Sequence, residues 1–290
     1  DTTYTPMADA ISEATGGDVT VKLYMGGELG PGPAEQYNRV IEGVADIAFS
    51  LPGYTASNFP LTLMAELPGV ITPETGTERI QANIEMLSKE YRRTVLVGLW
   101  SNAPNLLLMA EKQVESMDDL AGLNIRVPSR NAGLVVQAWG ANPVSMPAPE
   151  IYNAMQTGVI DGAMIDATTL RAFRLAEVTS SITMGMDTTT SLFFLIMNRD
   201  VFADLDEEAQ AAIKEAGREA SLNGNKAWLE VADAALADFA ATEGKTVIEL
   251  SEEEAARFNE VSSEVTEQIV ADAEAEGIAA QAYVSALRGN

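Results

Sequence analysis

The clearest alternation of apolar and polar stretches lies in the middle of the chain, over residues 118–166. Short apolar runs alternate there with stretches of helical spacing. In chain order, the pattern predicts a short helix that ends at Gly122, a strand over 123–127, a helix, a strand over 142–145, a helix from Glu150 and a strand over 160–165. This β-α-β-α-β order predicts a parallel sheet with helices on its faces, and thus an α/β fold.

The rest of the chain continues the mixture of helices and strands. Helices are predicted over residues 4–15, 34–42, 78–91 and 167–176, from 206 to about 242, and after Ser251. Strands are predicted over residues 19–24, 46–50, 94–100, 191–197 and 246–250. Gly217 and Gly224 fall inside the long helix, where glycine favours a bend or a break.

Composition and charge exclude several classes of function. The formal net charge of −25 argues against nucleic acid or an anionic membrane as a partner, and an anionic ligand would need local cations from the 18 Lys plus Arg. The sequence has no cysteine and no histidine, which excludes thiol nucleophiles, disulfides and metal sites built from these residues. A glycine cluster over residues 26–33 lacks the Gly-Lys-Ser/Thr end of a phosphate loop. We therefore expect neither a cofactor nor a metal site.

The length of the chain predicts more than one domain. Its 290 residues, 47% of them hydrophobic, are enough for two globular domains with a large core. No apolar run approaches the ~20 residues that span a bilayer, and no leader is evident at the start. We therefore expect that any export signal has already been removed.

Arg126 is the best candidate for a ligand contact. It lies at the end of the first strand of the central segment, and Pro128 stops the ladder just beyond it. Ligands of parallel sheets bind at the carboxyl ends of strands, where a guanidinium can hold a carboxylate through two parallel hydrogen bonds. An arginine in an ordinary surface ion pair has the same local pattern, so both interpretations stay open.

Three motifs in the same segment carry a family resemblance. They are LAGLNIRVP at residues 120–128, GANPVSMP at 140–147 and EIYNAMQTGVIDG at 150–162. Together they resemble the extracytoplasmic solute-binding proteins of TRAP transporters, the tripartite ATP-independent periplasmic carriers. The resemblance extends over about residues 7–217. It implies a periplasmic binding protein, usually monomeric, that delivers a small organic acid to membrane subunits.

The resemblance also implies a fold and a division into lobes. It implies a two-lobed α/β periplasmic-binding-protein fold of the type II kind, with two sheets flanked by helices, a hinge and a long bridging helix. The implied lobes are residues 1–103 plus 190–230 and residues 104–189 plus 231–290, with crossings at 102–105 and 191–197 and a helix from about 206 spanning both. The family normally has one more strand before its first helix, so either the sequence begins after that strand or the first sheet lacks it.

Matching the motifs position by position implies a ligand pocket. Arg126 matches the arginine that pairs with the ligand carboxylate. Met146 and Ala148 match a segment in which an aromatic side chain often covers the ligand, and the small Ala148 leaves room for a ring. Ile165 and Asp166 fall near an asparagine of the family that is absent here.

Other positions depart from members that bind sugar acids. Leu51 and Tyr54 replace a glutamate and an arginine of sialic-acid-binding members, and Asn105 falls where many members have a second arginine. One arginine among apolar residues such as Phe49 and Met164 fits an aromatic monocarboxylate, for example benzoate or hydroxybenzoate. The predicted ligand contacts are Arg126, Leu51, Tyr54, Trp100, Asn105, Met146, Ala148, Ile165, Asp166 and Phe193.

Several alternatives remain. For any single apolar residue of this set, core packing is the simpler explanation, while Tyr54, Asn105 or Asp166 would bind a ring hydroxyl. One alternative is another ligand: an aliphatic hydroxy acid, a keto acid or a dicarboxylate. Another is a role in sensing, in which the protein delivers its ligand to a receptor and not to a transporter. An enzyme would use Asp161 and Asp166 as acid and base, although we expect Asp161 and Tyr152 to be part of the scaffold.

Overall fold

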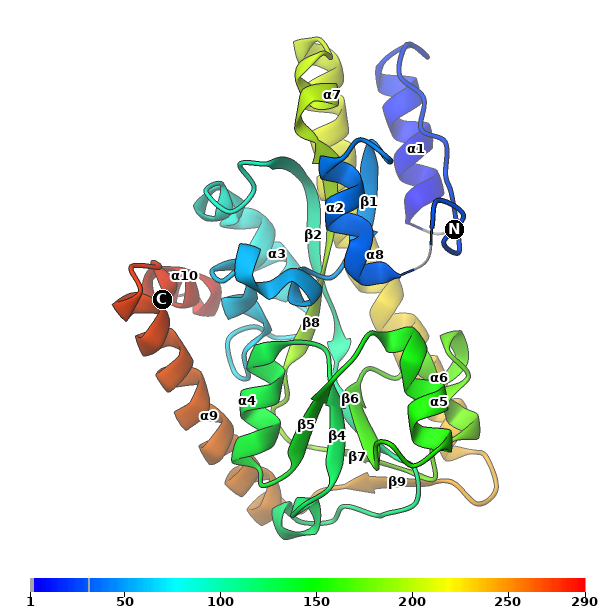
Figure 1. The fold of residues 1–290 in the computed structure, drawn as a ribbon, viewed down its shortest axis with the longest axis vertical. Helices are drawn as coiled ribbons and strands as arrows, with labels where there is room; N and C mark the ends of the chain where they lie inside the picture. The colour runs from blue at the N-terminus through cyan, green and yellow to red at the C-terminus, as the bar shows by residue number, and fades with distance from the viewer. Residues whose placement is uncertain (1–2, 31, 290) are drawn as a thin grey trace.

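The computed structural model describes residues 3–30 and 32–289 and arranges them in two α/β lobes, one above the other in Figure 1. In the described part of the chain each lobe has its own sheet, with strand orders β1-β8-β2 and β5-β4-β6-β3-β7-β9. Helices flank both sheets (Figure 1). The predicted fold class, a two-lobed α/β protein with two sheets, is therefore confirmed. Within residues 3–30 and 32–289, no helix combines the length and the apolar character needed to cross a bilayer.

The sheet of the upper lobe is antiparallel and buried on both faces. β1 (Ile47–Ser50) and β2 (Thr94–Pro104) pair with β8 (Thr190–Asn198), which lies between them. α1 (Tyr4–Ala14) and α8 (Glu207–Ala240) pack on one face. The helices on the other face are α2 (Gln36–Ile41), α3 (Gly76–Ala82) and α10 (Ala280–Arg288). Because neither face meets water, β8 is apolar along almost its whole length.

The central segment of the chain builds half of the lower sheet. β4 (Asn124–Val127) runs parallel to both β5 (Asn142–Ser145) and β6 (Gly162–Ile165). α4 (Arg130–Ala138) connects β4 to β5, and α5 (Ile151–Gln156) connects β5 to β6. The predicted parallel β-α-β-α-β unit is confirmed, and it brings the carboxyl ends of three strands to one edge of the sheet.

The chain passes between the two sheets along extended strands. β2 ends at Pro104, and β3 (Leu106–Met109) begins directly afterwards in the lower sheet, antiparallel to β6. The return runs from β7 (Ser181–Met184) into β8. β9 (Thr246–Glu249) closes the far edge beside β7. Residues 102–105 and 188–191 therefore lie side by side at the junction of the lobes, where Ser191 donates its backbone N–H to Asn102 Oδ1 at 2.8 Å.

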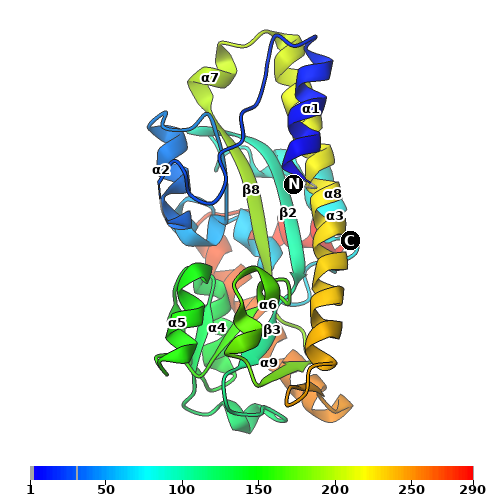
Figure 2. The ribbon, with the colours of Figure 1, turned by 90° about the vertical axis from the view of Figure 1, so that its right-hand side faces the viewer.

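Two long helices also join the lobes. α8 runs down the side of both lobes in Figure 2. α9 (Glu252–Ala275) begins on the lower lobe, where Phe258 is in the core, and its last turns pack with α10 against the upper sheet. The division into residues 1–103 plus 190–230 and 104–189 plus 231–290 stays a prediction, and the packing of α10 in the upper core argues for moving that helix to the first lobe.

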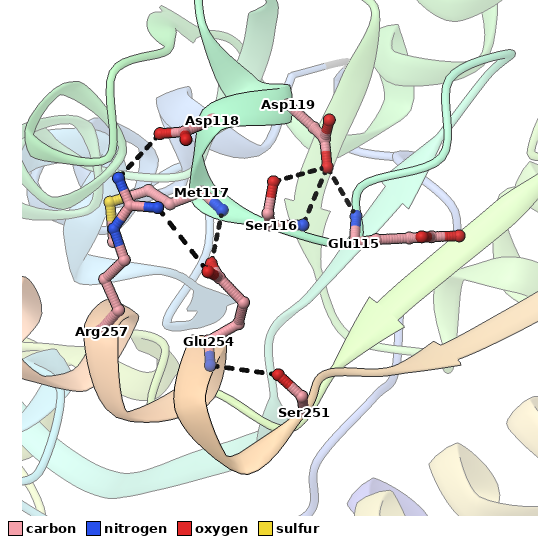
Figure 3. Close-up of polar contacts among 8 residues, drawn as sticks. All are labelled: Glu115, Ser116, Met117, Asp118, Asp119, Ser251, Glu254 and Arg257. Carbon is pink, nitrogen blue, oxygen red and sulfur yellow. Dashed lines mark hydrogen bonds and ion pairs between the residues drawn. The ribbon is translucent and has the colours of Figure 1, made fainter.

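The start of α9 is fixed to the loop before β4 by the polar cluster in Figure 3. Ser251 Oγ caps the helix by accepting a hydrogen bond from Glu254 N at 3.2 Å. The Glu254 carboxylate accepts one from Met117 N at 3.0 Å, and Arg257 pairs with Asp118 at 2.7 Å. Solvent screens exposed pairs and leaves them little net stabilisation, so the cluster mainly sets where α9 starts.

The remaining helical segments are short. They are α6 (Thr169–Ala172), α7 (Arg199–Ala203) and 3₁₀ turns at Pro33–Glu35, Pro52–Asn58, Thr62–Glu66, Ile84–Leu87, Met117–Leu120, Ala148–Glu150 and Leu175–Glu177. The helices predicted over residues 78–91 and 167–176 are each split into an α-helix and a 3₁₀ turn. Periodicity detected their buried face but not the change in helical pitch.

Two other predictions were wrong. Residues 19–24 form no strand in the described part of the chain: Val19 and Val21 pack on the upper core while Thr20 and Lys22 face outward, so their alternation reflects one-sided burial without a hydrogen-bonded neighbour. The long helix α8 is not broken by its glycines. A Cβ on Gly217 would lie 2.1 Å from the Val97 carbonyl oxygen, so this glycine allows α8 to approach β2 closely.

Candidate functional site

Arg126 lies at the carboxyl end of β4, on the edge of the lower sheet that faces the upper lobe. Its side chain is only 1% exposed, so it is not a surface arginine. Its Nε donates to the Met146 carbonyl oxygen at 2.9 Å, and its Nη1 lies 3.4 Å from the Met164 carbonyl oxygen. Met146 directly follows β5, and Met164 is the penultimate residue of β6. The two strands beside β4 therefore hold the guanidinium in a fixed orientation.

The buried guanidinium has little compensating negative charge. Arg126 forms no salt bridge within the residues that the structure describes. Burial lowers the pKa of Arg126 to about 10, and only the Tyr54 hydroxyl and the more distant Asp166 carboxyl act in the opposite direction. A buried cation is costly unless an anion accompanies it. Arg126 is therefore a buried cation that no carboxylate in the described part of the chain pairs with directly.

Residues of the upper lobe reach the same place. Tyr54, in the 3₁₀ turn after β1, hydrogen-bonds Arg126 and accepts a hydrogen bond from Ala148 N at 3.2 Å. At the neighbouring Gly53, a Cβ would lie 3.1 Å from Ser129 Cβ and 3.2 Å from the Pro128 carbonyl oxygen. The two lobes are thus in contact over the carboxyl end of β4, and the Tyr54 hydroxyl lies between two donors that would also suit a carboxylate oxygen.

Asp166 belongs to the junction between the lobes. Asn102 Nδ2 donates to its Oδ2 at 2.8 Å, and Thr168 N and Trp228 Nε1 donate to Oδ1 at 2.9 and 3.2 Å. The Thr168 hydroxyl adds a further donor. Burial raises the pKa of Asp166 against these hydrogen bonds. Three of these four donors are on Oδ1 and one is on Oδ2, so they hold the carboxyl in a fixed position and leave capacity on Oδ2 for one further hydrogen bond. The structure therefore gives Asp166 a positioning role, and its contact with ligand stays a prediction.

Replacing Asp166 with alanine should destabilise the protein strongly. The change leaves the buried donors of Asn102, Thr168 and Trp228 without their acceptor, and we expect the free energy of unfolding to fall by about 2–4 kcal/mol. Urea unfolding followed by circular dichroism measures it. The control is Asp161→Ala, which removes one acceptor for Asn124 N at a half-buried position and should cost about 1 kcal/mol. Equal losses in both variants would contradict the positioning role.

An aromatic cluster lies next to this junction. The ring of Phe49 stacks on those of Trp100 and Phe193, with centroids 5.7 and 5.1 Å apart. Trp228 of α8 lies 4.5 Å from Phe193 and packs against the cores of both lobes. Because Trp228 also binds Asp166, the rings and the guanidinium belong to one continuous region. The sequence analysis missed Trp228, since one tryptophan in an alanine-rich helix has no motif around it.

The other predicted contacts differ in how deeply they are buried and in what they contact. Met146, Ala148 and Leu51 are half-buried and lie on segments that meet at the junction of the lobes. Asn105 is buried at the crossing, with its Nδ2 bound to Thr189 Oγ1 at 3.2 Å and its Oδ1 unpartnered among the described residues. Ile165 is buried in the lower core. The structure therefore brings most of the predicted set together and places Ile165 among scaffold residues.

The arrangement does not support the acid–base alternative. Asp161 and Asp166 flank β6 at opposite ends, which separates them by roughly 16 Å at the usual rise of a strand. Asp161 accepts a backbone hydrogen bond at the start of β4, and the Tyr152 hydroxyl donates to Glu177 at 3.0 Å. No group of acidic residues within 3–30 and 32–289 has the arrangement of a metal site.

Comparison with known proteins identifies the family. The model for bacterial extracellular solute-binding proteins of family 7 matches residues 2–273. The protein YiiZ of Salmonella typhimurium, whose function is uncharacterised, is 28% identical over 76% of this chain and 68% of its own length. A solute-binding protein of Albidiferax ferrireducens is 26% identical over 73% of this chain. The aligned region spans 64% of that relative, so the chain covers about two thirds of these proteins.

Solved structures agree on the fold. A TRAP solute-binding protein from Rhodoferax ferrireducens in complex with copurified benzoate has a TM-score of 0.89 at 26% identity, covering 99% of this chain and 91% of that one. One from Bordetella bronchiseptica with bound mandelate has the same TM-score and identity, covering 99% and 92%. One from Sulfitobacter with bound galacturonate has a TM-score of 0.84 at 21% identity, covering 99% and 94%.

The family match and the fold agree with the motifs around Arg126. Proteins of this family are extracytoplasmic, bind small organic acids for TRAP membrane subunits and are not enzymes. The resemblance predicted from residues 120–128, 140–147 and 150–162 is confirmed. The chain is a member of bacterial extracellular solute-binding protein family 7, the solute-binding proteins of TRAP transporters.

Proposed function

We propose that this protein binds an aromatic monocarboxylate, such as benzoate or a hydroxybenzoate, between its two lobes. The observation that carries the proposal is the buried Arg126 guanidinium, which has no ion pair among the described residues. A single carboxylate balances one guanidinium, and two parallel hydrogen bonds fix its orientation. A second carboxylate would have no matching cation beside it.

The neighbouring donors suit one carboxylate group. Where the two lobes meet, the Tyr54 hydroxyl accepts from Ala148 N and hydrogen-bonds Arg126. A ligand carboxylate in this position would accept from Arg126 and Ala148 N, and the displaced Tyr54 hydroxyl would become a third donor to it. The ligand would then contact both lobes, because Tyr54 belongs to the upper lobe and Arg126 to the lower.

The aromatic cluster provides the other end of the site. A ring placed against Phe49, Phe193 or Trp228 would stack in the offset or edge-to-face geometries that aromatic rings prefer, and each buried ring contributes about 1.5–3 kcal/mol. Six buried side-chain polar atoms lack a partner among the described residues, and two of them, Trp100 Nε1 and Asn105 Oδ1, belong to the predicted ligand contacts. These two groups are enough for one ring hydroxyl, as in a hydroxybenzoate.

The relatives support an acid of this kind without fixing it. Benzoate and mandelate are bound by the structures from Rhodoferax ferrireducens and Bordetella bronchiseptica, and galacturonate by the one from Sulfitobacter. A uronate carries several hydroxyl groups, and each one left without a partner in an apolar site costs about 1–3 kcal/mol. We therefore favour the aromatic acid for this chain.

Binding is expected to close the lobes about residues 102–105 and 188–191. A ligand favours closure only through contacts that the open form lacks, which a ligand touching both lobes provides. We propose that the closed, monomeric protein works in the periplasm and presents the acid to the TRAP membrane subunits.

A thermal-shift screen with benzoate, 3-hydroxybenzoate, mandelate, succinate and galacturonate tests the proposed ligand class. At about 100 times its dissociation constant, a ligand stabilises the protein by about 2.7 kcal/mol. For a protein of this size we expect benzoate or 3-hydroxybenzoate to raise the melting temperature by about 4–5 °C. A shift only with succinate or galacturonate would refute the aromatic ligand and leave the family unchanged.

A further inference from the structure

A second ionisable group is buried where the lobes meet. Glu66 ends the 3₁₀ turn Thr62–Glu66 of the upper lobe and is only 3% exposed. Ser129, just beyond β4 in the lower lobe, donates its hydroxyl to Glu66 Oε1 at 2.7 Å. Asn131 of the same lobe also donates to this carboxyl. Within the described residues, the polar partners of Glu66 therefore come from the opposite lobe.

This contact is coupled to the ligand anchor by the chain itself. Ser129 caps α4 by accepting from Ala132 N at 3.2 Å, and it follows Arg126 by three residues along the end of β4. Asn131 Nδ2 lies 3.4 Å from the Leu63 carbonyl oxygen, a further contact between the lobes. Movement of β4 and α4 away from the upper lobe would thus break the Glu66 contact and open the Arg126 site together.

The surroundings of Glu66 contain no opposing charge that would keep it ionised. The ionisable groups on the elements packed against its turn are Tyr54, Glu90, Tyr91, Arg130, Tyr283 and Arg288. None of these groups contributes to the shift in the pKa of Glu66. Burial raises the pKa of Glu66 to about 8 against the hydrogen bonds from Ser129 and Asn131. The start of α4 favours an anion, but this effect is smaller than the cost of burial.

We propose that Glu66 is a proton-linked latch, so that closure of the lobes on a ligand takes up one proton at this carboxyl. The inference rests on the proposed function, because it requires a ligand that favours the closed form. In an open form Glu66 would face water without Ser129, and its pKa would return to about 4.3. The pKa is therefore higher in the closed form, and the affinity for ligand is greatest at low pH, falls as the pH rises from about 5 to 8, and is constant above about 9.

Calorimetric titration with benzoate tests the latch, since benzoate has no other ionisable group than its carboxylate. Measurements in two buffers of different ionisation enthalpy give the number of protons taken up. We expect about 0.9 proton per ligand at pH 7 and about 0.1 at pH 9. The dissociation constant should rise about tenfold from pH 6 to pH 7 and about fivefold from pH 7 to pH 8.

Two variants separate the latch from other buried carboxyls. Glu66→Gln keeps a neutral acceptor for Ser129 and should bind benzoate with no proton uptake. The matched control is Glu90→Gln: Glu90 also has a raised pKa, but it binds Leu61 N, Thr62 N and the Thr62 hydroxyl within its own lobe. This control should take up the same number of protons as the wild type.

The possible outcomes distinguish the latch from the proposed function. Benzoate binding by the wild type without proton uptake, or with uptake that persists in Glu66→Gln, would overturn the latch and leave the function intact. If Glu66→Gln does not fold, the number of protons taken up by the wild type decides between these outcomes. If benzoate does not bind, the proposed ligand fails, and the same two-buffer titration with whichever acid of the thermal-shift screen does bind tests the latch instead: binding of that acid without proton uptake at pH 7 would overturn it.

Discussion

Replacing Arg126 with alanine should raise the dissociation constant for benzoate by between about 30-fold and about 5,000-fold. Removing one partner of a buried, hydrogen-bonded charge pair costs about 2–5 kcal/mol of binding free energy, and each 1.4 kcal/mol is tenfold in affinity. The loss is large because the ligand carboxylate would be buried without its cation. Calorimetry or a fluorescence titration measures it, and Arg126→Lys should recover only part of the affinity because an ammonium lacks the two-point geometry.

The unliganded Arg126→Ala protein should keep its stability. The wild-type guanidinium is buried without an ion pair among the described residues, so its removal relieves a cost of folding and offsets the lost packing. The matched control is Arg130→Ala, four residues along the chain at an exposed position on α4. It should bind benzoate like the wild type. The anchor role would be refuted by unchanged binding in Arg126→Ala or by an equal loss in Arg130→Ala.

Replacing Gly217 with alanine should destabilise the protein by about 3 kcal/mol or more. The new Cβ would lie 2.1 Å from the Val97 carbonyl oxygen, which is backbone and cannot rotate away. α8 would have to move from β2, and Ser221 Oγ would lose its hydrogen bond from Leu99 N, now 3.0 Å. Overpacking of a well-packed core usually costs about 1–3 kcal/mol, and a clash with backbone belongs to the upper end. Urea unfolding gives the value.

Gly224 of the same helix is the control. Its Cβ would first meet the Thr3 side chain at 3.3 Å, and a side chain can adjust where a carbonyl cannot. Alanine is the better helix former by about 1 kcal/mol, so Gly224→Ala should leave the free energy of unfolding within about 1 kcal/mol of the wild type. Comparable destabilisation by the two substitutions would contradict the specific role of Gly217 in the contact between α8 and β2.

The lower sheet could be predicted from sequence because its signals are local. Each strand of residues 118–166 is a short apolar run bounded by turn residues, and each is followed by a helix, so the parallel order follows from the chain alone. β4 and β5 were predicted within one residue of their observed ends. The family motifs lie in the same segment, which placed Arg126 at the site.

Features that depend on distant contacts could not be predicted. Gly217 was expected to bend or break the helix, because only the structure shows Val97 opposite to it. The alternation at residues 19–24 predicted a strand, but a ladder also requires a neighbour, and none is present among the described residues. The hydrogen bond between Asn102 and Asp166 could not be predicted either, because Asn102 lies 64 positions away in sequence and is brought to Asp166 by the crossing strands.

The site shows the same limit. The position of Arg126 follows from its strand, but its lack of an ion pair, the feature that predicts an anionic ligand, depends on residues from several other strands and from the upper lobe. Trp228 and Glu66 lie in segments without any motif and reach the junction of the lobes only after folding. The sequence therefore predicted the part of the candidate site around Arg126 but not the part around these two side chains.

The most direct test of the central claim is one calorimetric titration of benzoate into the wild-type protein at pH 6. The account predicts one site per chain with a dissociation constant of about 1 μM or tighter, equivalent to about −8 kcal/mol. It attributes this affinity to the Arg126 ion pair and the burial of one ring. Absence of binding by benzoate, with tight binding of galacturonate or succinate in the same titration format, would contradict it.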